Sequence, residues 1–303
     1  MPDPVIVREV VSRVAPLAFR FHDELLGVAV GDGLEVTAWP TQAPATTVAA
    51  AVGPSGVFAF PSLPGLLRLP PSHSGPPIPV AFGEGDLAYW AGLPPPRPFT
   101  IGVADPWGRF LPCVFQTAAP SRGLALPACL SQSHSGPPSD GEQGVPLFSA
   151  PTRAVQAPVA VVRAELWDPL AGSPAAWALV EGRLGGGPPF RGLADALGRL
   201  TLLIPYPPPD DPFTSPPASF LPGLGPPLTE QEWPLSLSAT YTPQLPAPQA
   251  PDLCSVLAQA PVTLWARYAD RVPLDSLTVR YGRELVVRSE DTDPPAGSLR
   301  VTA

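Results

Sequence analysis

Residues that most often carry catalysis are scarce in this chain. It contains three histidines, His22, His73 and His134, and histidine is the usual general base near neutral pH. None of them lies in a nucleophile motif such as Gly-x-Ser-x-Gly, and the Gly-Pro-Ser-Gly at 53–56 has the pattern of a hairpin turn rather than of a strand-to-helix elbow. We therefore expect no catalytic residues and no enzymatic activity, with a hydrolase only as a distant alternative.

Metal and cofactor chemistry is equally hard to place. The three cysteines form no Cys-x-x-Cys pair and have no zinc-type spacing with histidine, so we expect them to be buried apolar side chains. Gly-Gly-Gly-Pro at 185–188 is followed by neither Lys nor a helix and predicts a hairpin, not a phosphate loop. Acidic groups at 210–211 and 290–293 are possible calcium ligands, but solvated loop charge is the simpler interpretation. We expect no cofactor and no bound metal. The cysteines are Cys113, Cys129 and Cys254.

Seven tryptophans are the remaining side chains suited to recognition. Aromatic residues near turns and linkers stack on sugar rings or insert into protein partners. A carbohydrate-binding or adhesive β-sandwich module is therefore the alternative to a protein-binding role. The tryptophans that border turns or linkers are Trp90, Trp107 and Trp233. Those that fall within predicted strands, and are expected in the core, are Trp39, Trp167, Trp177 and Trp265.

Short strands must position these side chains, because proline excludes long helices. The chain has 49 prolines in 303 residues, about three times the ordinary share of about 5%. Each proline in a helix interior costs about 3 kcal/mol. Hydrophobic residues nevertheless make up 45% of the chain, which is too much for a disordered protein. The sequence predicts an all-β fold with two or more small antiparallel β-sandwich domains joined by proline-rich linkers.

A weak internal repeat supports the sandwich prediction. Residues 18–60 and 161–206 each open with an alternating strand, pass through an acidic turn that ends in Gly, and close with a Gly-containing turn and a strand. Period-two alternation with turn residues at matching offsets is typical of a half-buried antiparallel sheet. Residues two apart share a face of a strand, so the closing strands should turn alternate side chains into a core. These side chains are Phe58, Phe60, Leu200 and Leu202.

The order of these elements resembles the carboxypeptidase regulatory-like domain, a transthyretin-like β-sandwich. The resemblance rests on the Asp-x-x-x-Gly turns at 23–27 and 168–172 and on the later turns at 53–56 and 195–198. The first repeat departs from the pattern, because Val52-Gly53 stands where an acidic residue often opens the last hairpin. With the hairpin sequence Arg-Tyr-Gly-Arg-Glu-Leu-Val at 280–286, the chain resembles proteins found beside phage-tail-like contractile injection systems. The resemblance implies a structural component at the cap or baseplate of such a particle, and it transfers no site residue.

Proline-rich segments suggest the domain organisation. Such segments favour extended polyproline conformation and act as semi-rigid linkers. The hexamer Ser-His-Ser-Gly-Pro-Pro occurs at 72–77 and 133–138; chance repetition is simpler than a duplicated partner-binding strap. The linkers are 70–79, 93–98, 131–146 and 205–227. The expected parts are an N-terminal β-sandwich over 1–92 with the first repeat, a linker-rich β-hairpin region over 93–150, and a C-terminal β-sandwich over 151–303 with the second repeat and terminal strands.

Charge indicates the kind of partner. The net charge is −8 and all 18 basic residues are Arg without a cluster, so we expect no nucleic acid or anionic lipid as a partner. Charged residues make up 15% of the chain, against about 25% in ordinary soluble proteins, so we expect a homo- or hetero-oligomeric assembly. No apolar run approaches membrane-spanning length. The first residues lack the pattern of a signal peptide and the odd number of cysteines argues against a disulfide framework. We therefore expect cytoplasmic synthesis, with release from the cell as part of a particle if the injection-system resemblance holds.

Overall fold

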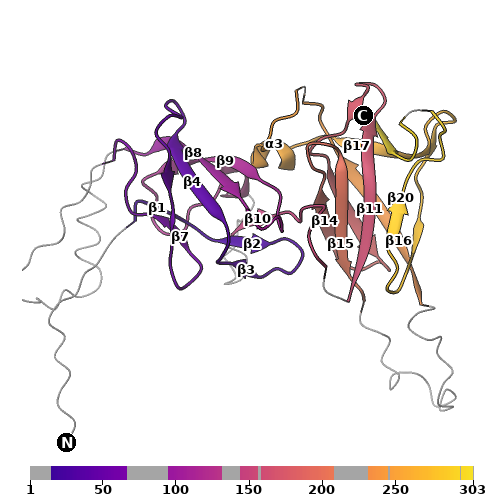
Figure 1. The fold of residues 1–303 in the computed structure, drawn as a ribbon, viewed down its shortest axis with the longest axis horizontal. Coiled ribbons are helices and arrows are strands. Elements are labelled where there is room, and N and C mark those ends of the chain that lie inside the picture. The colour runs from indigo at the N-terminus through magenta and orange to yellow at the C-terminus, as the bar shows by residue number, and fades with distance from the viewer. Residues whose placement is uncertain are drawn as a thin grey trace, which may run out of the picture. The chain divides into compact units, whose positions relative to one another are not determined.

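The protein is all-β, as its proline content and alternating pattern predict (Figure 1). The computed structural model describes residues 15–66, 95–131, 144–155, 158–207, 231–244, 246–293 and 295–302. Within these residues two short helices, α2 (Ala128–Ser131) and α3 (Leu253–Leu257), interrupt the strands. No helix in this part of the chain is long and apolar enough to span a membrane.

The chain forms two compact units whose boundaries interleave. Unit 1 comprises residues 1–21, 29–103 and 115–145, and unit 2 comprises 22–28, 104–114 and 146–303. Residues of the expected hairpin region over 93–150 are thus divided between the two units. Several sequence-based predictions fall outside the described residues: those for His73, Trp90, His134, Asp210, Asp211 and both copies of the repeated hexamer.

Phenylalanine side chains form the core of unit 1. The ring centroids of Phe19 and Phe115 lie 5.3 Å apart, as do those of Phe21 and Phe58, and both pairs pack edge to face, the geometry that aromatic pairs prefer. The four rings come from four short strands: Phe19 from β1, Phe21 from β2, Phe58 from β7 and Phe115 from β9. Among these strands β1 pairs with β7, and β9 pairs with β8, which also pairs with β4. The sheets in the first part of the chain have the orders β1-β7-β6, β5-β4-β8-β9 and β10-β2-β3. Their strands are β1 (Leu17–Phe19), β2 (Phe21–Asp23), β3 (Ala29–Val30), β4 (Glu35–Pro40), β5 (Val48–Ala49), β6 (Ala51–Val52), β7 (Phe58–Phe60), β8 (Arg97–Ala104), β9 (Cys113–Ala119) and β10 (Val145–Leu147).

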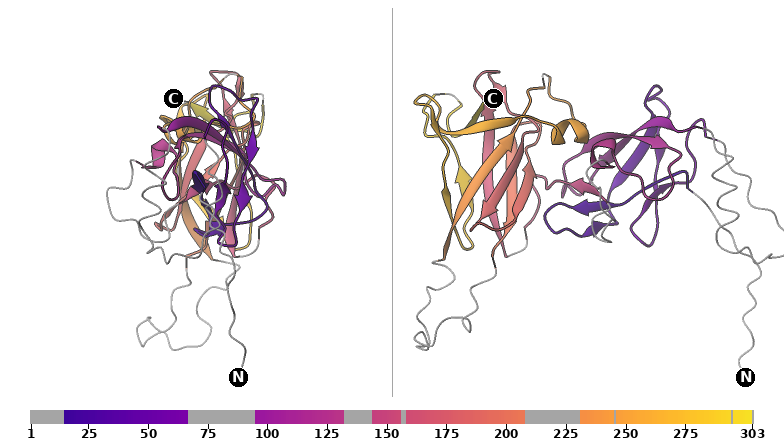
Figure 2. Two further views of the ribbon diagram at one scale, coloured as in Figure 1. Left: turned by 90° about the vertical axis from the view of Figure 1, so that its left-hand side faces the viewer. Right: turned by 180° about the vertical axis from the view of Figure 1, so that it is seen from behind.

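Unit 2 encloses a second core, made of aliphatic side chains, between two groups of strands. Figure 2 shows the strands from two further sides. In one group β11 pairs with β15, β20 and β21; in the other β16 pairs with β13, β17 and β19; and the pairing of β17 with β21 joins the two groups into one 11-stranded sheet. Val162, Leu202, Leu235 and Val279 are fully buried between them. The strands are β11 (Val159–Asp168), β12 (Ser173–Pro174), β13 (Leu179–Leu184), β14 (Pro189–Leu193), β15 (Arg199–Pro205), β16 (Glu232–Thr240), β17 (Pro261–Arg267), β18 (Val272–Pro273), β19 (Leu277–Arg280), β20 (Leu285–Val287) and β21 (Leu299–Thr302). The pairings of β11 with β20 and β21 are parallel, whereas the sequence had suggested only antiparallel pairs.

The two repeat segments share their strand pairing. In each, the opening strand pairs antiparallel with the closing strand: β1 with β7, and β11 with β15. All four of the side chains expected in a core are buried. Burial alternates in β7, whereas in β15 five consecutive residues, 200–204, are buried, so both faces of that strand are covered. These are Phe58, Phe60, Leu200 and Leu202.

The turns of the two repeats also match in their hydrogen bonds. In the five-residue turns, the amide of Gly27 donates to the carbonyl of Asp23 at 2.8 Å, and that of Gly172 to Asp168 at 2.9 Å. In the four-residue turns at 53–56 and 195–198, the corresponding bond between the last and first residue measures 3.0 Å in both. The two segments therefore share these turn hydrogen bonds and the pairing of the opening with the closing strand. They differ in the opening itself, which is one strand, β11, in the second segment and two strands in different sheets, β1 and β2, in the first.

Candidate functional site

His22 is the one histidine among the described residues, and it lies in an ion-pair network. Its Nε2 is 3.5 Å from a carboxylate oxygen of Glu24, and the guanidinium of Arg191 binds the same carboxylate at 2.6 Å. Its Nδ1 is buried and has no hydrogen-bond partner. Within the described chain no Ser or Cys side chain hydrogen-bonds His22, so this arrangement lacks the nucleophile that a catalytic triad requires.

Of the acidic residues at 290–293, Asp291 binds backbone amides. The carboxylate of Asp291 accepts hydrogen bonds from the amides of Tyr268 at 2.8 Å and Ala269 at 3.1 Å. Burial opposes ionisation of this group, but the two amides and the charge of Arg300 outweigh it and lower the pKa of Asp291. Among the residues that the structure describes, no three His, Cys, Asp or Glu side chains lie close enough together to hold a metal ion.

The cysteines differ from one another. Cys113 is a free, buried thiol, and burial together with the nearby Asp252 raises its pKa to about 12. Cys129 and Cys254 are disulfide-bonded. The expectation of buried apolar thiols is therefore confirmed for Cys113 and wrong for the other two, because sequence spacing does not reveal which cysteines lie close in space. The cysteines no longer argue for a reducing compartment.

Only one of the four tryptophans expected in the core is fully buried. Trp177 is buried at a positive φ of 62°, and its ring Nε1 donates to the carbonyl of Pro248 at 3.0 Å. Its backbone amide donates to the carbonyl of Asp195 at 3.4 Å and its own carbonyl accepts from the side chain of Gln259 at 3.0 Å, so all three polar groups of this buried residue are satisfied. The other three are half-buried: Trp39, Trp167 and Trp265.

Trp107, by contrast, is 63% exposed at the tip of a rigid turn. The turn has the sequence Asp105-Pro-Trp-Gly-Arg109, and the buried carboxylate of Asp105 accepts from the amides of Trp107 at 3.2 Å, Arg109 at 2.8 Å and Phe110 at 3.1 Å. The Nε of Arg109 donates to the same carboxylate at 3.1 Å. Gly108 has a positive φ of 67°, which glycine adopts without strain.

A second turn repeats this construction. In Asp195-Ala-Leu-Gly-Arg199 the Asp195 carboxylate accepts from the amide of Leu197 at 2.9 Å, the amide of Arg199 at 2.9 Å and the Nε of Arg199 at 2.8 Å. Leu197, at the same position as Trp107, is 61% exposed. We call these two segments, residues 105–109 and 195–199, the Asp–Arg turns. Both belong to unit 2.

Two further Asp-anchored turns in unit 2 also expose an apolar side chain. The carboxylate of Asp168 accepts from the amide of Leu170 at 2.8 Å, and Leu170 is 72% exposed. The carboxylate of Asp23 accepts from the amide of Leu25 at 2.9 Å, and the next residue, Leu26, is 57% exposed. The sequence predicted these turns but not their exposed tips, although a large apolar residue between Asp and Gly is a signal that sequence reasoning missed.

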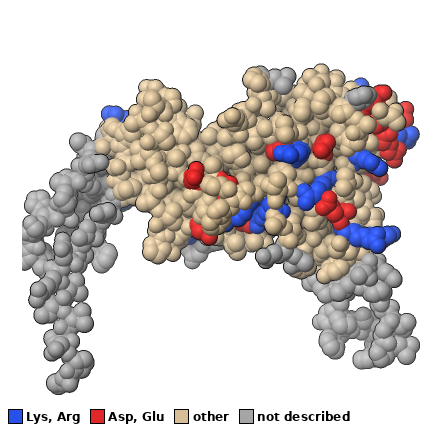
Figure 3. Space-filling view, in the orientation of Figure 1, with Lys and Arg blue, Asp and Glu red and all other residues tan. Residues whose placement is uncertain are grey.

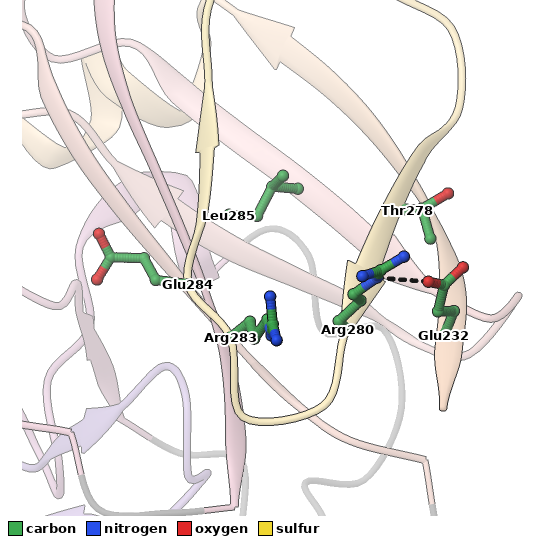
Figure 4. A pocket seen from close by; sticks show the side chains of 6 residues that line it. All are labelled: Glu232, Thr278, Arg280, Arg283, Glu284 and Leu285. Carbon is green, nitrogen blue, oxygen red and sulfur yellow. Dashed lines mark hydrogen bonds and ion pairs between the residues drawn. The ribbon is translucent and has the colours of Figure 1, made fainter. Parts of the chain in front are cut away.

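An open depression of about 360 Å³ lies on the same unit (Figure 4). It is bordered by β19, by β20 and by the connection 281–284 between them. On one side of it Arg280 of β19 pairs with Glu232 of the neighbouring β16, as the dashed line in Figure 4 shows, and Glu284 pairs with Arg163 at 3.0 Å. The lining residues are Glu232, Thr278, Arg280, Arg283, Glu284 and Leu285.

An aromatic cluster stiffens the connection between β19 and β20. The ring of Tyr206 lies 5.1 Å from that of Trp233 and 4.8 Å from that of Tyr281. The Tyr206 hydroxyl donates to the carbonyl of Arg280 at 3.2 Å and accepts from the amide of Gly282 at 2.9 Å. Trp233 is therefore half-buried in a structural cluster and does not form the exposed sugar-stacking surface that its position near a linker had suggested.

Charged side chains cover little of the molecular face drawn in Figure 3, and most of that face consists of other residues. Comparison of the chain with family models, with characterised proteins and with solved structures gave no match. The resemblance to carboxypeptidase regulatory-like domains therefore stays an expectation based on sequence motifs.

Proposed function

We propose that this protein is a non-catalytic structural component of a large protein assembly and that it docks onto other subunits through the Asp–Arg turns. The observation that carries the proposal is the pair of exposed apolar tips, Trp107 and Leu197, on turns whose backbone amides and arginine are held by one buried carboxylate each. A tip that is already fixed loses little conformational entropy on binding. Tryptophan at such a place is also the residue type most enriched among interface hot spots.

Composition supports the same role. Only 15% of the residues are charged, and a surface with so little charge is better suited to burial against partners than to permanent exposure. The motif resemblance adds the finer proposal that the assembly is a phage-tail-like contractile injection particle, with this chain at its cap or baseplate. In that case the chain leaves the cell with the particle.

The test measures association directly. Static light scattering gives the mass of the purified chain, alone and mixed with candidate neighbouring subunits. Trp107→Ala and Leu197→Ala should each weaken the complex by at least tenfold, which corresponds to about 1.4 kcal/mol, without lowering the melting temperature. Val52→Ala is the matched control, because Val52 is 49% exposed but lies outside these turns. A chain that stays monomeric with every subunit offered contradicts the proposal.

A carbohydrate-binding module is the second candidate, and a particular observation favours it. The guanidinium of Arg109 lies 4.5 Å from the centroid of the Trp107 ring, which fixes the orientation of an exposed indole that can stack on a sugar ring. Under this proposal, soluble glycans should change the tryptophan fluorescence of the wild type and not that of Trp107→Ala. A glycan response that Trp107→Ala retains would exclude Trp107 as the sugar platform.

A further inference from the structure

We propose that the open side of unit 2 between β19 and β20 binds an extended peptide of a partner protein, which adds a strand to the free edge of β19. This surface is separate from the Asp–Arg turns. The proposal uses backbone hydrogen bonds that the fold leaves available and one arginine that has no partner within the described chain.

The directions in which the backbone groups of β16 point show which backbone groups of β19 point away from β16. Pro234 pairs with Thr278 in the register of these strands, but the carbonyl of Pro234 accepts from Gly185 on the opposite side at 2.8 Å, and proline has no amide hydrogen. In an antiparallel pair, two residues directly opposite each other either exchange backbone hydrogen bonds or both direct their backbone groups away from each other. Since the carbonyl of Pro234 points away from β19, the amide and carbonyl of Thr278 point away from β16. The carbonyl of Arg280, two residues on, likewise points outward, but it already accepts from the Tyr206 hydroxyl and from the amide of Arg283. The outward groups that remain available are therefore the amide and carbonyl of Thr278.

No strand in the described part of the chain pairs with this outer edge of β19, and none pairs with β20 on the side away from β11. Two strand edges thus border the depression, one from each group of strands in unit 2. Figure 4 shows the space between them, with Leu285 on one border and Thr278 on the other. Free strand edges are the surfaces to which extended peptides add in β-augmentation.

The side chains around the depression define the chemistry of the peptide. Leu277 and Leu285 are half-buried and pack against the core of unit 2, so they offer an apolar contact to one face of an added strand. Glu232 is neutralised by Arg280, and Glu284 by Arg163. Arg283 is exposed and makes no ion pair with any described residue. The unmatched charge is therefore positive, and it favours a peptide that alternates apolar and acidic residues.

A second copy of β19 fits this edge less well. Its sequence, Leu-Thr-Val-Arg, contains no carboxylate for Arg283. Edge-to-edge pairing of two β19 strands would also bring the unmatched Arg283 of both copies to one seam, and like charges on adjacent strands are unfavourable. The occupant that the charges favour is thus a segment of another protein.

The probe is a capped, fluorescently labelled heptapeptide of alternating valine and glutamate, titrated into the full chain; the control peptide carries lysine in place of glutamate. We expect the valine–glutamate peptide to bind, to slow the exchange of the Thr278 amide proton, and to bind at least fivefold more tightly than the lysine peptide. Thr278→Pro should weaken binding at least tenfold, because it removes the outward amide hydrogen without removing a hydrogen bond to β16. Arg283→Ala should weaken it at least fivefold.

Two control variants keep the test independent of folding. Thr278→Val retains the amide and should bind as the wild type does, as should Arg288→Ala, which removes an exposed arginine that does not line the depression. The proposal is overturned if the wild type binds neither peptide at millimolar concentration, or if Thr278→Pro folds and binds normally. Self-association that Thr278→Pro abolishes would overturn it in favour of a second copy. None of these results depends on association through the Asp–Arg turns, which light scattering tests separately.

Discussion

Replacement of Gly198 by alanine should destabilise unit 2 far more than the same replacement at Gly186. Both glycines have a φ of +74°, so both variants place an alanine in the left-handed region. They differ in what surrounds the new methyl group. At Gly186 nothing lies within 4 Å of an added Cβ, whereas at Gly198 the Cβ would lie 2.4 Å from the carbonyl oxygen of Leu166 and 3.2 Å from Cβ of Pro174.

The magnitude follows from two separate terms. Alanine at positive φ costs about 1–2 kcal/mol, and this term is common to both variants. The steric term applies only to Gly198→Ala and is about 1–3 kcal/mol for overpacking of a tight site. The clashing oxygen cannot withdraw easily, because the same residue accepts from the amide of Ala175 at 2.9 Å and donates its own amide to the carbonyl of Gly198 at 2.8 Å.

Calorimetry of the two variants beside the wild type measures the difference. A free-energy difference of about 1–3 kcal/mol corresponds to a melting temperature lower by about 2–12 °C for Gly198→Ala than for Gly186→Ala. Equal melting temperatures would refute the reasoning, because they would show that a Cβ at position 198 does not clash with the carbonyl oxygen of Leu166 in β11. The same result would also remove the close contact on which the rigidity of the second Asp–Arg turn depends.

Three further predictions concern individual side chains. Cys113 should resist maleimide in the native protein and react after denaturation; since its pKa is raised to about 12, its contribution to stability is complete below pH 9 and is lost as the pH rises toward 12. Asp291 has a lowered pKa, so it stabilises the fold above its ordinary pKa of 3.8, and this contribution to stability disappears in acid. Asp291→Asn should therefore flatten the acid limb of a stability–pH curve. An unchanged acid limb would contradict the assignment. Asp105→Ala leaves the amides of its turn without an acceptor and should cost about 1–3 kcal/mol in a denaturant titration, whereas Asp275→Ala, at an exposed position, should be neutral.

The fold class was predictable because it depends on local chemistry. Proline forbids long helices wherever it occurs, and the alternation of β7 identifies the buried face of Phe58 and Phe60 from the sequence alone, whereas β15 is buried on both faces. The turns were predictable for the same reason, since Asp and Gly act within four or five residues of one another. These features need no knowledge of which distant segments meet.

The features that were missed depend on long-range pairing. Alternation shows that Trp167 and Trp265 lie in strands, but it does not show how completely other strands cover the faces on which they lie, and both are half-buried. The free edge at Thr278 follows from the pairing of β19 with β16, some forty residues earlier in the chain, and from the direction of the Pro234 carbonyl. No local pattern at 277–280 distinguishes that edge from an interior strand.

In the Asp–Arg turns, the residues that hold the backbone in place differ from the residue whose side chain is exposed at the tip. Aspartate, glycine and arginine satisfy the backbone in both turns, and the side chain between them takes no part in that network: it is tryptophan in one turn and leucine in the other, with similar exposure. A substitution at the tip therefore changes the apolar surface that the turn presents while leaving the folded state nearly as stable as before. Under the proposed docking function, the side chain at these two positions can therefore vary without the loss of stability that usually limits such change.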